Sequence, residues 1–293
     1  MSGRGVVYDL GYQPHDGPRL GRSAAVSSTV GDGVRRIFGM RRRARKKILP
    51  WMLFGVALLP AVVFVGFTFL SSQLVPGELI DTPWADASSY FDLAAGTVLL
   101  FCALAAPELL IPDRMDGVLS VYSSRPMTVL DYLGARAGAL AIAFGGFLIA
   151  PQLLMYVGFA ALEPGGFAGN LLGNWLDLVR VIASTAVYLV ALGAPAFLVS
   201  VFTKRPAVAT GVFLGGMFAV NAVATGFAEA GTRWAALLSL PSHPALVRDA
   251  IFDRTSTNLI SQQGFDWWVS AAIIVAVAAV TVVVAVRRYR SLL

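Results

Sequence analysis

Charged residues are scarce in this chain. Only 14% of its 293 residues are Asp, Glu, Lys or Arg, against about 25% in a typical soluble protein. Hydrophobic residues make up 57% of the sequence, and the mean hydropathy is +0.70. Because so many apolar residues cannot all lie in one core, we expect much of the surface to face lipid. The composition excludes a soluble enzyme, a secreted disulfide scaffold and a disordered chain.

Residues that carry hydrolytic or metal chemistry are equally few. The single cysteine, Cys102, cannot form an intrachain disulfide, and the two histidines, His15 and His243, lie in segments that we place on opposite sides of a membrane. The sequence has no G-x-x-x-x-G-K-[ST] phosphate-binding loop, no H-E-x-x-H and no G-x-S-x-G. We therefore expect no catalytic residue, no metal site, no cofactor and no ATPase activity of the chain by itself. His243 is expected to be an ordinary loop residue.

Six uncharged runs of about 20 residues predict an all-α polytopic membrane protein with six transmembrane helices. Prolines fall inside three runs, at Pro107, Pro151 and Pro195, where we expect kinks. Glu108 is the only formal charge within the runs, and its place near the end of the second run favours a snorkelling or helix-terminus role over a proton relay. The runs are 48–70, 93–112, 137–162, 181–203, 206–228 and 267–286.

The basic residues predict the orientation of these helices. All but four of the 23 Lys and Arg residues lie in the N-terminal tail, in the 113–136 loop, in the 204–205 turn or after residue 286, whereas the opposite loops hold ten carboxylates. Since Lys and Arg favour short cytoplasmic loops, both termini are expected in the cytoplasm. The first apolar run is too long for the core of a cleavable signal peptide, so none is expected.

An amphipathic segment precedes the first run. From residue 23 onwards its apolar residues recur at helical spacing, and eight cations follow between residues 35 and 47. We expect an interfacial helix on lipid at the inner membrane surface, while an ordinary basic anchor without an ordered helix stays open. The orientation rule accounts for the cations, so no nucleic-acid partner is expected. The apolar stripe consists of Val26, Val30, Val34, Ile37 and Phe38.

Two of the loops carry a pattern of their own. The 113–136 loop predicts a short helix, a break at Arg125 and Pro126, and a new helix start capped by Thr128 or Asp131. The stretch 229–266, on the outer side, carries apolar clusters around prolines. We expect it to form two short helices that re-enter the outer membrane interface.

Glycines stand one helical turn apart in two places, Gly134 with Gly138 and Gly211 with Gly215. Such small-residue faces let helices approach closely. Packing within the chain and a subunit interface both stay open as explanations.

The segment between the second and third runs resembles that of the ABC-2 type permeases, the transmembrane subunits of ATP-binding cassette exporters of type V architecture. It matches their acidic-Arg-x-x-Gly-x-Leu, small-Arg-Pro and Tyr-Leu-Gly pattern. The rest of the resemblance is topological and covers nearly the whole chain, and the tail over 8–22 is similar to a lead-in of actinobacterial members. The matching residues are Asp113, Arg114, Gly117, Leu119, Ser124, Arg125, Pro126, Tyr132, Leu133 and Gly134.

This resemblance implies a permease of a bacterial plasma membrane that works as a pair, either of identical copies or with a paralogous permease. It implies two separate cytoplasmic ABC ATPase subunits, which hold the ATP and Mg. Residues 1–47 would form a cytoplasmic tail with the interfacial helix, and 48–293 a six-helix transmembrane domain. A coupling helix near 113–128 would seat in an ATPase groove, braced by the helix over 23–45. The implied coupling residues are Asp113, Arg114, Gly117, Leu119, Arg125 and Pro126.

Polar residues within the runs are candidates for a substrate path between the paired subunits, although packing within the bundle accounts for each equally well. The weakly polar path favours amphipathic or lipid-like cargo over a free ion. The alternative function is a membrane-embedded enzyme or assembly factor without an ATPase, which predicts clustered His, Asp or Glu at one face, and the sequence shows no such cluster. A passive channel would need polar or charged rings along a pore, and the near absence of charge within the runs argues against an ion channel. The candidate path residues are Gln152, Tyr156, Tyr188, Asn221 and Thr225.

Overall fold

The computed structural model describes residues 21–40, 45–74, 86–119, 127–164 and 166–291, and all regular structure within these ranges is helical. Six helices are long and apolar enough to cross a membrane, so the protein is a multi-pass membrane protein, as the sequence predicts. The helices are α1 (Arg22–Ile37), α2 (Arg45–Leu74), α3 (Ala87–Met115), α5 (Val129–Leu162), α6 (Phe167–Gly173), α7 (Trp175–Phe202), α8 (Pro206–Glu229), the 3-10 helix η1 (Arg233–Leu238), α9 (Ser242–Ile251), α10 (Leu259–Gln262) and α11 (Trp267–Arg290).

The six long helices extend beyond most of the predicted uncharged runs. Polar residues continue the helices because they cap them or find partners in neighbouring helices. The side chain of Asp86 accepts a hydrogen bond of 2.6 Å from the Ser89 backbone N–H at the start of α3. At the other end α3 reaches Met115, which places Glu108 about two turns inside the helix rather than near its end.

The start of α5 confirms one local prediction. Thr128 caps the helix, because its side chain accepts a hydrogen bond from the Asp131 backbone N–H and Asp131 accepts one from the Thr128 backbone N–H. Together with the extended end of α3, this cap shortens the predicted 113–136 loop at both ends. The predicted short helix and the break at Arg125 and Pro126 fall largely on residues 120–126, outside the described residues.

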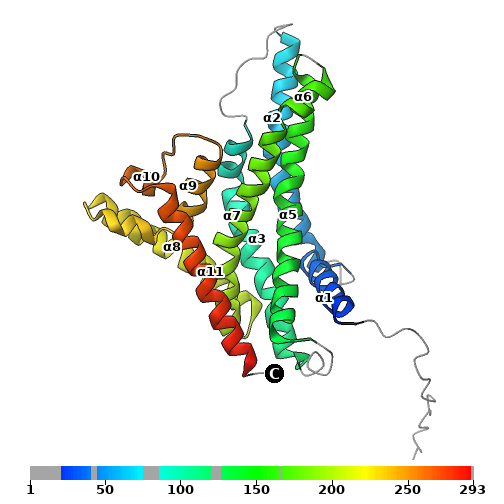
Figure 1. The fold of residues 1–293 in the computed structure, drawn as a ribbon, viewed down its shortest axis with the longest axis vertical. Helices are drawn as coiled ribbons and strands as arrows, with labels where there is room; N and C mark the ends of the chain where they lie inside the picture. The colour runs from blue at the N-terminus through cyan, green and yellow to red at the C-terminus, as the bar shows by residue number, and fades with distance from the viewer. Residues whose placement is uncertain (1–20, 41–44, 75–85, 120–126, 165, 292–293) are drawn as a thin grey trace, which may run out of the picture.

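Helix α3 occupies the centre of the bundle, between α5 and α7 (Figure 1). In its most apolar stretch 67% of the residues are buried, against 22% in the corresponding stretches of α8 and α11. Aromatic rings fill the core, and Phe101 of α3 stacks on Phe147 of α5 with 4.3 Å between ring centroids. Helix α8 runs obliquely to the other long helices (Figure 1). Pro107, Pro151 and Pro195 all lie inside continuous helices, and the kinks stay a prediction.

Helix α1 confirms the amphipathic helix that the sequence predicts, although it ends at Ile37. Its apolar stripe packs against the protein core, with Val30 and Val34 among the side chains that contact it. The approach to α5 is close: a Cβ placed on Gly33 would lie 2.5 Å from the Ala139 Cβ. The alternative of a basic anchor without an ordered helix is therefore wrong, and contact with a membrane surface stays a prediction.

Short helices η1, α9 and α10 occupy the stretch that precedes α11, and they lie at the end of the bundle opposite the chain's C-terminus (Figure 1). The interpretation of His243 as a loop residue is wrong. Its ring is 1% exposed in α9, and it contacts the Ser270 Oγ through Nδ1 at 2.9 Å and the Leu237 carbonyl through Nε2 at 3.0 Å. Because a carbonyl only accepts, Nε2 donates the hydrogen in this arrangement.

Candidate functional site

A partly buried cluster of charged and polar side chains joins three helices at the end of the bundle where the C-terminus lies, which we call the C-terminal end. We name it the Asp113 cluster, and its members are Asp32 and Arg36 of α1, Asp113 of α3, and Tyr132 and Arg136 of α5. Asp113 is 1% exposed, and its two carboxylate oxygens each lie 2.5 Å from a guanidinium nitrogen, one of Arg36 and one of Arg136. The Tyr132 hydroxyl donates a third hydrogen bond to Asp113, at 2.8 Å.

The cluster is balanced in charge. Arg136 is fully buried, and Asp32 lies 3.2 Å from it and 2.8 Å from Arg36, so two carboxylates face two guanidinium groups. A buried charge is tolerated only when it is paired and hydrogen-bonded, and removing one partner leaves the other uncompensated. The cluster therefore fixes the positions of α1, α3 and α5 relative to one another.

Arg114, the next residue of α3, connects this helix to the end of α7. Its guanidinium donates to the carbonyl of Val201 at 2.6 Å, to that of Ser200 at 3.2 Å, and to that of Thr203. The last carbonyls of a helix have no partner within the helix and attract cations. Arg114 thus holds the end of α7, directly before the turn into α8.

An apolar cluster beside the charges adds the last transmembrane helix. The ring of Tyr289 in α11 stacks on Tyr132 at 5.7 Å between centroids, and its hydroxyl donates to the Leu110 carbonyl at 3.4 Å. Leu119, 5% exposed, packs in this cluster with Val201 of α7. Side chains of α1, α3, α5, α7 and α11 therefore converge at the place where the chain leaves α3.

The turn after α3 depends on a glycine. Gly117 has a φ of +70°, and the Val118 backbone N–H reaches back to the Asp113 carbonyl at 3.1 Å. This positive φ is readily adopted only by glycine, and it closes the helix end and sends the chain away. Gly117 thereby sets the direction in which the segment over 118–128 begins.

The structure describes four of the six coupling residues that the sequence predicts. Asp113 and Arg114 lie within the last turn of α3, where each contacts neighbouring helices, and Gly117 and Leu119 follow in the turn and the apolar cluster. The remaining two, Arg125 and Pro126, lie outside the described residues. Contact with an ATPase stays a prediction for all six.

The candidate path residues all make contacts within the chain. Gln152 of α5 donates to the Ala87 carbonyl at 2.7 Å, and Tyr188 of α7 stacks on a phenylalanine of α3 at 5.2 Å. The Tyr156 hydroxyl donates to the Leu171 carbonyl. Of the two residues in α8, Asn221 accepts a 2.6 Å hydrogen bond from a serine after η1, and Thr225 donates to the Asn221 carbonyl at 3.0 Å. Their place on a substrate path stays a prediction.

A second group of ion pairs lies at the opposite end and attaches α9 to α3. Arg248 is 3% exposed, and it contacts Asp92 at 2.5 Å and its own neighbour Asp249 at 2.9 Å. Although burial alone would lower it, the nearby Tyr188, Asp92 and Asp249 together raise the pKa of Arg248 above its ordinary value, so the charge persists. These contacts hold α9 in place on the bundle.

Asp32, Arg36 and Arg136 were missed as site residues by sequence reasoning. Arg136 was placed at the end of a loop because its charge ended the uncharged run, whereas the structure buries it two turns into α5. The signal that could have found it is the pattern itself: an arginine and an aspartate at facing ends of two adjacent apolar helices. Comparison with protein-family models and with curated proteins found no match for this chain.

Proposed function

We propose that the chain is the membrane-spanning permease subunit of an ATP-driven exporter, of the ABC-2 type, and that a separate cytoplasmic ATPase drives it. Six membrane-spanning helices and the motif resemblance over 113–134 support this function. The observation that carries it is the Asp113 cluster. Together with Arg114 and the apolar cluster around Tyr289, it connects the start of the candidate coupling segment to five helices.

A rigid connection is what a translocator needs, because it performs no chemistry of its own. It alternates between two packings of its helices, and a partner biases that equilibrium through contacts that differ between the two states. A displacement of the segment after Met115 would be transmitted to α1 and α5 through Asp113 and to α7 through Arg114. The ATP and Mg belong to the ATPase in this scheme.

The orientation of the proposed permease follows from its charges. Lys204 and Arg205 in the turn before α8, and Arg287, Arg288 and Arg290 at the end of α11, lie at the same end as the basic helix α1. We place this end in the cytoplasm, with both termini, since positive charge favours the cytoplasmic side of the plasma membrane. The outer helices η1, α9 and α10 then face the opposite side.

A second permease copy is the proposed partner within the membrane. A Cβ placed on Gly211 or Gly215 of α8 would meet no neighbouring helix of the described chain within 4 Å, so the small size of these residues serves no close contact there. Val208, Val212 and Phe218 on the same helix are exposed. Small residues beside exposed apolar ones suit close packing against another helix in lipid, which favours a subunit interface over intrachain packing.

The test is reconstitution with a candidate ATPase, taken from a neighbouring coding sequence that carries a P-loop and an ABC signature. We expect ATP hydrolysis only when both proteins are present, and co-purification of the two from detergent. Measurable hydrolysis by the purified chain alone, or free ATPase in the presence of folded permease, would contradict the proposal. A P-loop lysine variant of the ATPase is the control that assigns the hydrolysis to the partner.

A further inference from the structure

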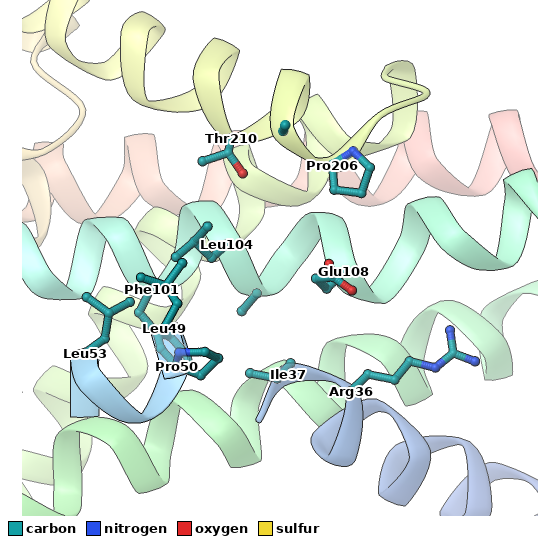
Figure 2. A pocket seen from close by; sticks show the side chains of 12 residues that line it. Arg36, Ile37, Leu49, Pro50, Leu53, Phe101, Leu104, Glu108, Pro206 and Thr210 are labelled. Carbon is teal, nitrogen blue, oxygen red and sulfur yellow. The ribbon is translucent and has the colours of Figure 1, made fainter. Parts of the chain in front are cut away.

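A groove of about 530 Å³, which we call the α5–α11 groove, lies between α5, α7 and α11. Its volume falls within the range of small-molecule sites, about 300 to 1,000 Å³. The cavity between α1, α2, α3 and α8 has Arg36 and Glu108 in its wall (Figure 2), whereas the described residues that line the α5–α11 groove include no charged one. Thr281 is the single polar side chain among them, and its hydroxyl donates to the Val277 carbonyl at 2.9 Å. The groove therefore suits an apolar ligand or the apolar part of a larger one.

The groove lies at membrane depth and has the length of one leaflet. All three of its helices are long and apolar enough to cross a membrane. Along α5 its wall extends from Leu130, the second residue of the helix, to Ala141. The 11 steps from residue 130 to residue 141 span about 16 Å, which is close to half of a hydrocarbon core of about 30 Å. On α11 the wall ends at Val286, so the groove covers the half of the membrane at the C-terminal end.

The groove is open toward the lipid. Leu130 and Val282 of its wall are exposed. A Cβ placed on Gly134 would meet no atom within 4 Å, so no described helix presses against α5 there. In the hydrocarbon region such a groove is filled by apolar chains, because there is no water there and an unfilled wall loses its dispersion contacts. The acyl chain of a membrane lipid is an apolar chain of this length at this depth.

Two exposed arginines stand where the groove reaches the end of α11. Arg290 lies one helical turn beyond Val286, so its side chain starts from the same face of α11 as the groove wall. Arg287 is exposed in the same last turn. Neither forms an ion pair with a carboxylate of the described residues. A negatively charged headgroup can therefore reach both.

The surrounding side chains keep this end of the groove positive. Asp131 is the one acidic residue at this end of the three groove helices, and Arg22 binds it at 2.8 Å. Asp116 follows α3, which does not line the groove, and is exposed to solvent. The segments before α5 and after α11, 120–128 and 291–293, contain one arginine and no acidic residue, so they add no negative side chain.

We propose that the α5–α11 groove binds one anionic phospholipid, with an acyl chain along α5 and the headgroup beside Arg290. Basic pockets between membrane-spanning helices at the cytoplasmic side bind anionic headgroups in this way. A helix of a second copy suits the groove less well, because a copy in the same orientation brings its own basic end beside Arg290 and places like charges together. The binding requires only the membrane-spanning helices, and it does not rest on the proposed function.

Native mass spectrometry of the purified full-length chain tests the site. The delipidated protein is titrated in a neutral detergent with phosphatidylglycerol or phosphatidylcholine of identical acyl chains, so that the two lipids differ only in the headgroup. We expect the first phosphatidylglycerol to bind more tightly than the first phosphatidylcholine. Arg290→Gln removes the charge beside the headgroup and should weaken phosphatidylglycerol about fivefold while leaving phosphatidylcholine unchanged.

Matched variants locate the effect. Arg205→Gln makes the same change at an exposed arginine of the same end, directly before α8, which does not line the groove, and should bind phosphatidylglycerol as the unaltered chain does. Ala137→Trp fills the groove from α5 and should weaken both lipids. Ala276→Trp places the same side chain on an exposed part of α11 outside the groove and should weaken neither.

Two results would overturn the proposal. One is equal binding of the two lipids, or phosphatidylglycerol binding that survives Arg290→Gln at full strength. The other is unchanged lipid binding in Ala137→Trp together with a loss of dimer in that variant, which would assign the groove to a contact between copies. Since no ATPase is present in these measurements, their failure leaves ATPase recruitment untouched, and a failed recruitment leaves this binding intact.

Discussion

Replacement of Arg136 should expose how strongly the Asp113 cluster holds the bundle together. Breaking a buried ion pair by removing one partner costs about 3–5 kcal/mol. In Arg136→Met, Asp113 keeps Arg36 and the Tyr132 hydroxyl, so we expect a loss near the lower end of that range. In Asp113→Asn, the fully buried Arg136 loses its nearest carboxylate and keeps the more distant one of Asp32, so we expect a loss toward the upper end.

The double variant separates an ion-pair effect from a packing effect. Removing both charges should destabilise the protein by less than the sum of the two single changes, with a coupling of about 1–3 kcal/mol. The measurement is the free energy of unfolding in detergent micelles by denaturant titration for the four proteins. Arg180→Met, which breaks an exposed pair with Asp177, serves as the control and should change stability little. Strictly additive losses of stability, or single losses below about 0.5 kcal/mol, would refute the claim that the cluster fixes α1, α3 and α5 relative to one another.

Three other predictions concern single residues. Gly117→Ala should destabilise the protein by about 1–2 kcal/mol in thermal unfolding, because the positive φ of this turn is strained for alanine. The control is Gly169→Ala in α6, where a Cβ meets open space and φ is ordinary, and it should leave stability unchanged. Equal losses in the two variants would contradict this. Burial lowers the pKa of His243 below its ordinary 6.5, so the unfolded chain binds the proton more readily than the folded chain. Stability should therefore be full above about pH 6.5 and fall below it. His243→Gln should flatten the profile of melting temperature against pH, and an unchanged slope would contradict this. In a Cys102→Ala background, an impermeant thiol reagent added to intact cells should label Ala168→Cys and not Lys204→Cys. Labelling of both variants would contradict the proposed membrane orientation.

The existence of the six spans could be predicted because it depends on composition alone. Long uncharged runs are visible without any knowledge of neighbours, and so is the Thr128 cap, whose partner Asp131 stands three residues away. Several other helix ends could not be predicted. Asp113 and Arg136 stand within helices because each neutralises the other. The sequence shows that the two residues flank adjacent apolar runs, but not that they form a buried ion pair.

The candidate site was predicted only in part, because its side-chain pairs join residues that are far apart in the sequence. The motif resemblance found Asp113, Arg114 and Gly117, but it described them as members of a docking loop rather than as the rigid end of α3. Leu119 was expected to bind a partner, and in the structure it packs against Val201 within the chain. Arg36 was read as one of many surface cations, although it reaches Asp113, a residue far away in the sequence. Such pairings require the tertiary fold.

The central claim is that an ATPase docks on the segment between α3 and α5, and Arg125 is the residue that tests it most directly. Leu119→Asp would disturb the apolar cluster inside the chain, so a charge reversal at Arg125 is the cleaner change. Arg287→Glu provides the control, since Arg287 is an exposed arginine at the end of the bundle where α3 ends. The measurement is the amount of ATPase that co-purifies with each variant inserted at normal levels.

We predict that Arg125→Glu loses most of the ATPase, about tenfold or more, while Arg287→Glu retains it. This result would place the docking contact on the segment between α3 and α5. Equal retention by both variants would contradict the account, because the segment would then carry no part of the contact with the ATPase.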